Sequence, residues 1–145
     1  MNKIYFHELN VKSALVERRP LKEYLLTLFY KENTQVKRVD IIFCNDKYLL
    51  SLNRSYLKHD YETDTMSFLL SDPKQPVVGE LYLSIDRIKS NALELKIPYH
   101  KELLRVIIHS CLHLCGYKDH PKTLAKKMET IQEHYLKQWL VSRET

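Results

Sequence analysis

The segment Tyr99–Cys115 constrains the fold more than any other part of the chain. Its apolar residues recur at intervals of three and four, the period of a helix with one buried face. Gly116 follows directly and fits the position just beyond a helix end, where glycine tolerates a left-handed backbone. The predicted buried residues are Leu103, Leu104, Ile107, Ile108, Cys111 and Leu112. Such a helix needs a second layer to cover that face.

Four other segments carry the alternating or β-branched patterns of strands. They are Lys3–Glu8, Val36–Cys44, Thr65–Leu70 and Val77–Ser84. Two prolines lie in the loop sequence Ser71–Pro76 between the last two segments, which predicts that these strands form a hairpin. The patterns leave the order of the strands in the sheet open.

Helical patterns fill much of the remaining chain, and we expect Asp86 to cap one of these helices. They are expected at Pro20 to about Lys31, Asp46 to about Tyr56, Asp86–Leu95, and after Pro121 to about Leu140. Only two of the 145 residues are glycine, which argues against glycine-rich phosphate loops and a many-turned β-sandwich. We therefore predict a single α+β domain over residues 1–145, with a mixed sheet of about four strands packed by helices.

The charge and the cysteine content restrict the partners and the compartment. A net charge of +5 favours a phosphate-rich partner, although an ordinary basic protein fits the charge equally well. Three cysteines, without a CxxC pair, do not form a disulfide framework. We find no secretory signal and no apolar run long enough for a bilayer, so we expect a cytoplasmic protein without a membrane partner.

Two histidines one helical turn apart are the main functional signal. His109 and His113 project from the same helix face, with their side chains about 5–6 Å apart, so both can bind one ion. The helix ends at Gly116, and the following turn can bring Asp119 or His120 back to the same point. Two imidazoles and one further ligand leave a position open on zinc, as in catalytic sites. A pair of ordinary helical histidines is the alternative, but this concentration of ligand types favours metal.

The residues next to the two histidines restrict the possible ligands and the possible catalytic mechanism. Cys111 and Cys115 follow the histidines by two residues, on another face of the helix, so buried apolar cysteines are the better interpretation. Ser110 stands where an HExxH metalloprotease has its general base, and serine cannot do that work. We therefore expect no catalytic side chain beyond the metal ligands, with a metal-bound water as nucleophile.

These residues resemble the YbeY family of bacterial endoribonucleases, which is associated with ribosomal RNA maturation and ribosome quality control. The family pattern is His-x-x-x-His-Leu-x-Gly-Tyr-Asp-His, with three histidines as zinc ligands. The resemblance runs in order from Leu52 to Glu129. Its matching parts are Leu52-Asn53, Tyr56, Thr63–Phe68, Gly79–Ser84, His109, His113, Leu114, Gly116, Tyr117 and Met128-Glu129.

The chain departs from the family pattern at two places. An extra Lys118 puts Asp119 at the position of the third ligand and moves His120 one residue further. Either could bind zinc, and we favour Asp119 because it preserves the six-residue step from His113. Leu57 replaces an arginine that the family uses for substrate.

The resemblance implies a zinc-dependent endoribonuclease that cleaves single-stranded RNA with ribosomal RNA and ribosome-associated proteins as partners. Lys58, His59 and Lys118 are the candidates for RNA contact, although each also fits a solvated basic surface. A ribosome-associated binding factor with a structural or vestigial metal site is the main alternative. A metallohydrolase acting on peptides or small molecules is another.

Overall fold

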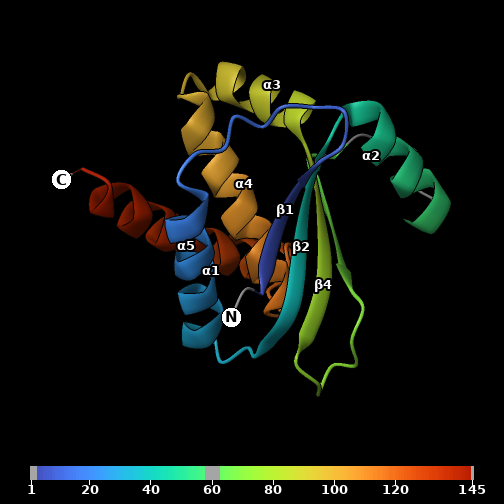
Figure 1. The fold of residues 1–145 in the computed structure, drawn as a ribbon, viewed down its shortest axis with the longest axis vertical. Helices are drawn as coiled ribbons and strands as arrows, with labels where there is room; N and C mark the ends of the chain where they lie inside the picture. The colour runs from blue at the N-terminus through green and yellow to red at the C-terminus, as the bar shows by residue number, and fades with distance from the viewer. Residues whose placement is uncertain (1–2, 58–62, 145) are drawn as a thin grey trace.

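The computed structural model describes residues 3–57 and 63–144, and they form one mixed sheet with helices against it (Figure 1). The strand order is β1-β2-β4-β3. Strands β1 (Ile4–Glu8), β2 (Val36–Cys44) and β4 (Val77–Ser84) are parallel, and β3 (Thr65–Leu69) runs antiparallel to β4. The predicted α+β fold with four strands is therefore confirmed, and the predicted hairpin is β3–β4.

Among residues 3–57 and 63–144, five α-helices accompany the sheet. They are α1 (Arg18–Lys31), α2 (Asp46–Leu52), α3 (Ile85–Leu95), α4 (Tyr99–Leu114) and α5 (Lys122–Ser142). A single π-helical turn, Asn53–Leu57, continues α2. Helices α1 and α4 lie against one side of the sheet, and α5 crosses behind α4 (Figure 1). Helix α2 lies on the opposite side of the molecule from α5 (Figure 1). No helix in the described residues has both the length and the apolar character that a bilayer crossing requires.

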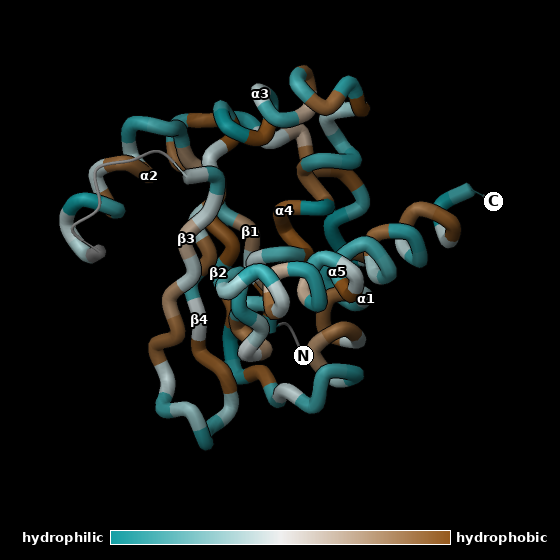
Figure 2. The backbone as a smooth tube through the Cα atoms, turned by 180° about the vertical axis from the view of Figure 1, so that it is seen from behind, coloured by the Kyte–Doolittle hydropathy of each residue, from teal (hydrophilic) through white to brown (hydrophobic). Residues whose placement is uncertain are grey.

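The core has a large and a small part because the sheet is apolar on both faces. The large part lies between the sheet and helices α1, α3, α4 and α5, and its fully buried residues include Phe29, Phe43 and Leu103. The small part is Cys44, Leu49 and Met66, where α2 covers the opposite face. Figure 2 shows hydrophobic residues concentrated along the strands, whereas α5 is largely hydrophilic.

The N-terminal cap of α3 differs from the sequence prediction. Helix α3 begins at Ile85, and the side chain of Ser84 accepts the capping hydrogen bond from the Arg87 amide. Asp86 instead accepts a hydrogen bond from the backbone N–H of Asp46, at 2.8 Å, so it links α3 to the start of α2. The prediction that Asp86 caps the helix was wrong, because a neighbouring serine took that role and released the carboxylate for a long-range contact.

Strand β4 and the end of α4 approach each other closely at Gly79. A Cβ atom placed on Gly79 would lie 2.8 Å from one methyl group of Leu114, so glycine allows the helix end to sit against the sheet. Leu114 directly follows His113 in the chain. This packing brings the histidine face of α4 under the edge strand β3.

Candidate metal centre

The end of α4 is built to reverse the chain at a fixed point. The N–H of Tyr117 donates to the carbonyl of Leu112, at 3.2 Å, and the N–H of Gly116 donates to that of His113, at 3.0 Å. These are the two hydrogen bonds of a Schellman turn, and Gly116 has the positive φ, 101°, that the turn needs. The reversal directs the chain after Gly116 back along the histidine face.

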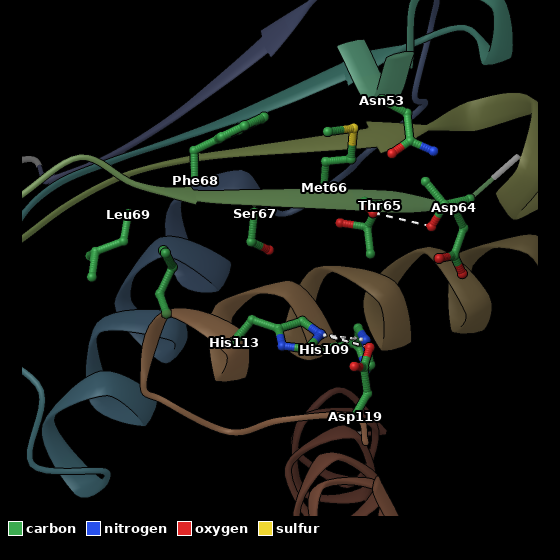
Figure 3. A pocket seen from close by; sticks show the side chains of 12 residues that line it. Asn53, Asp64, Thr65, Met66, Ser67, Phe68, Leu69, His109, His113 and Asp119 are labelled. Carbon is green, nitrogen blue, oxygen red and sulfur yellow. Dashed lines mark hydrogen bonds and ion pairs between the residues drawn. The ribbon is translucent and has the colours of Figure 1, made fainter. Parts of the chain in front are cut away.

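Three side chains, two from α4 and one from the chain after the turn, converge at one point (Figure 3). His109 Nε2 lies 3.0 Å from His113 Nε2, and Asp119 Oδ2 lies 3.4 Å from His113 Nε2. One ligand atom from each residue lies within 4.8 Å of the others. Both imidazoles are half-buried, and the Asp119 side chain is 54% exposed. The structure therefore brings together the histidine pair and the aspartate that we favoured as the third ligand.

The outer nitrogens of both imidazoles face oxygen acceptors. His109 Nδ1 lies 2.7 Å from the side-chain oxygen of Gln132, and His113 Nδ1 lies 3.1 Å from the backbone oxygen of Tyr117. An N–H on each Nδ1 satisfies these oxygens and leaves two Nε2 lone pairs directed at one point, beside a carboxylate. This arrangement fits a divalent cation, since metal-bound histidines commonly donate their second N–H to an oxygen.

The environment of His113 favours the neutral form of its imidazole. Burial lowers the pKa of His113, and the neighbouring His109 lowers it further, whereas the Tyr117 carbonyl and Asp119 oppose the shift. A neutral imidazole is the form that binds a metal ion. The local electrostatics therefore agree with the geometry.

A cavity of about 450 Å³ opens between this group and the edge strand β3 (Figure 3). Thr65 and Ser67 point from β3 toward α4, whereas Met66 and Phe68 point away. The residues that line the cavity are Asn53, Thr63, Asp64, Thr65–Leu69, His109, His113, Leu114 and Asp119. The sequence had marked Thr63–Phe68 only through the family resemblance, and the structure shows that this segment forms the wall opposite the histidines.

The other residues singled out from the sequence lie as follows. His120 is exposed and, among the described residues, does not belong to the convergent group. Lys118 is exposed and lines a neighbouring cavity with Tyr117 and Lys127. Lys58 and His59 fall outside the described residues.

The serine and cysteines of α4 take no part in the group. Ser110 is fully buried and donates to the carbonyl of Ile107, at 2.9 Å, so it is a helix residue, as expected. Cys111 is also fully buried, and burial raises its thiol pKa well above the ordinary value. Cys115 is half-buried, and burial raises its pKa to about 11. Both cysteines therefore behave as packing residues.

The turn that carries Asp119 is anchored from α1. Glu32, directly after that helix, accepts hydrogen bonds from the hydroxyls of Tyr117, at 2.6 Å, and Tyr135, at 2.5 Å. Burial, together with the Glu32 carboxylate, raises the pKa of Tyr117 to about 12, so this phenol remains a donor. Glu32 therefore ties the turn to α1 and α5, a connection that sequence patterns did not reveal.

The comparisons with known proteins agree with this fold and point to one family. A sequence model of the family described as "Endoribonuclease YbeY" matches residues 8–140. A protein of that name from Cytophaga hutchinsonii is 40% identical over 124 residues, which cover 86% of this chain and 85% of the relative. Another, from Karelsulcia muelleri, is 38% identical and covers 92% of this chain and 94% of the relative.

The fold also matches a solved structure. The solution structure of TM1509 from Thermotoga maritima superposes with a TM-score of 0.64 and 29% sequence identity, covering 97% of this chain and 93% of that one. The overall fold of this chain is thus shared with that protein. The chain belongs to the Endoribonuclease YbeY family.

Proposed function

We propose that this chain is a zinc-dependent endoribonuclease of the cytoplasm that cleaves single-stranded regions of ribosomal RNA during maturation and ribosome quality control. The convergence of His109, His113 and Asp119 beside an open cavity carries the proposal. Family membership supports RNA as the substrate class, and ribosome-associated proteins are the partners to expect.

The three candidate ligands supply two kinds of donor atom. His109 and His113 offer neutral nitrogen ligands, and Asp119 offers a carboxylate oxygen from the more exposed side. When bound, a divalent ion at this point lowers the pKa of a coordinated water to about 7 and offsets charge on phosphoryl oxygens. Two neutral ligands and one anionic ligand would leave a divalent ion with a net positive charge, which would favour an anionic phosphodiester.

The cavity limits how a substrate can enter. One wall is the edge strand β3 and the other is the histidine face of α4. We expect a single RNA strand to lie between them with a phosphate at the centre, because unpaired nucleotides can be splayed apart by contacting side chains. We assign RNA contacts to Lys58, His59 and Lys118, with Lys58 and His59 replacing the cation that Leu57 does not supply.

Cleavage of a single-stranded ribosomal RNA fragment tests the proposal. The parent protein, supplied with zinc, should cut; a chelator should stop the reaction and added zinc restore it. A His109→Ala/His113→Ala variant should be inactive while it keeps the fold. RNA binding that survives chelation without cleavage would instead identify a ribosome-associated binding factor. Turnover of peptides but not RNA would identify a different metallohydrolase.

A further inference from the structure

His109 has two hydrogen-bond partners, one at each ring nitrogen. Gln132 Oε1 lies 2.7 Å from Nδ1, and His113 Nε2 lies 3.0 Å from Nε2. A neutral imidazole carries one proton, so it can donate to only one of the two. The position of that proton decides what the pair of histidines can bind.

One of the two tautomers blocks the metal centre. If the proton lies on Nε2, His109 donates to His113 Nε2, and both nitrogens are occupied by each other. If the proton lies on Nδ1, it bonds to Gln132 and both Nε2 lone pairs stay free. The histidine–histidine hydrogen bond therefore competes directly with metal binding.

The side-chain amide of Gln132 is fixed in the orientation that favours the second tautomer. Its Nε2 donates to Glu133 Oε2, at 3.0 Å, so its oxygen faces His109. Gln132 is only 8% exposed, and a reversed amide would place its carbonyl oxygen against the Glu133 carboxylate, where neither group can donate. Glu133 thus determines which end of the amide His109 meets.

Glu133 is in turn held as an anion. Arg105 donates to both of its oxygens, each at 2.8 Å, and this pairing lowers the pKa of Glu133. Arg105 also donates to Glu102, a residue only 4% exposed, at 2.8 Å. The guanidinium is therefore fixed between two carboxylates. It holds Glu133 in place, and Glu133 in turn fixes the orientation of the Gln132 amide.

We propose that Gln132, oriented by Glu133 and Arg105, is a positioning residue that selects the metal-binding tautomer of His109. The inference rests on the proposed metal centre. Helix α5 packs against α4 and supplies the acceptor that keeps the proton away from Nε2. The amide is neutral, so it directs the imidazole without adding negative charge next to the centre.

The test compares Gln132→Met, which keeps the side-chain length but removes the acceptor, with Ile131→Val on the same helix as a control for loosened packing. Long-range proton–nitrogen NMR of the metal-free protein at about pH 8.5, above the usual imidazole pKa of about 6.5, reports the tautomer. Zinc affinity is measured by competition with a chromophoric chelator. Glu133→Ala serves as a second variant that frees the amide.

We expect the parent and Ile131→Val proteins to carry the His109 proton on Nδ1, and Gln132→Met to carry it on Nε2. Zinc binding should weaken by about 10–100-fold in Gln132→Met, as for other partners of metal-bound histidines, and by less in Glu133→Ala. An Nε2 proton in the parent overturns the inference, even if no variant folds. An unchanged tautomer and affinity in Gln132→Met also overturn it. Neither readout involves RNA, so loss of the ribonuclease proposal leaves this test intact.

Discussion

Removal of the Asp119 carboxylate should separate the two candidates for the third ligand. Asp119 Oδ2 lies 3.4 Å from His113 Nε2, inside the group of ligand atoms, whereas His120 is exposed and outside it. Asp119→Ala leaves two imidazoles as the protein ligands and removes the only negative charge in the group. His120→Ala changes a side chain that the geometry does not direct to the ion.

The expected loss follows from the position of the carboxylate. Its side chain is 54% exposed, so water can replace the missing ligand and the centre is weakened rather than abolished. We expect zinc affinity to fall by about 10–1,000-fold in Asp119→Ala, or about 1.4–4.1 kcal/mol. His120→Ala should stay within about twofold, or about 0.4 kcal/mol. Chelator competition measures both, and a larger loss in His120→Ala would refute the assignment of Asp119.

Gly116→Ala should lower the free energy of unfolding by about 1–2 kcal/mol, because Gly116 has a φ of 101°; denaturant unfolding measures this, and an equally stable variant contradicts the strain argument. The pKa of Asp40 lies below its ordinary value of 3.8 because Arg38 donates hydrogen bonds to it. A folded-state pKa below the unfolded-state value stabilises the protein at neutral pH, and this stabilisation is lost as the pH falls from the unfolded-state pKa through the folded-state one. Asp40→Asn should therefore reduce the acid dependence of unfolding below about pH 4, and identical pH profiles would disprove the contribution. A thiol reagent should modify Cys115 slowly and before the other two cysteines, which are fully buried; prior reaction of a buried thiol would contradict the packing.

The parts of the fold that were predictable have strong local patterns. Val36–Cys44 and Val77–Ser84 match the observed strands residue for residue, because β-branched and apolar residues predominate in both, Asn45 ends the first and Pro76 precedes the second. The helix ending before Gly116 was equally clear, because periodicity and a C-terminal glycine agree. These local signals also placed His109 and His113 on one face.

The rest of the site depends on tertiary packing. Gln132 is 23 residues from His109, and nothing in its local sequence marks it as a partner of the imidazole. Glu32 meets Tyr117 across 85 residues, for the same reason. Sequence patterns describe the face of one element, whereas these contacts arise where two or three elements meet, so only the assembled structure reveals them.

The metal content of the purified, untagged protein tests the central claim most directly. Plasma mass spectrometry of the parent should find about one equivalent of zinc per chain, as three converging protein ligands predict. The His109→Ala/His113→Ala variant should contain none. A parent protein that binds no metal even after zinc is supplied would contradict the account, and would leave the histidine face of α4 without the chemistry proposed for it.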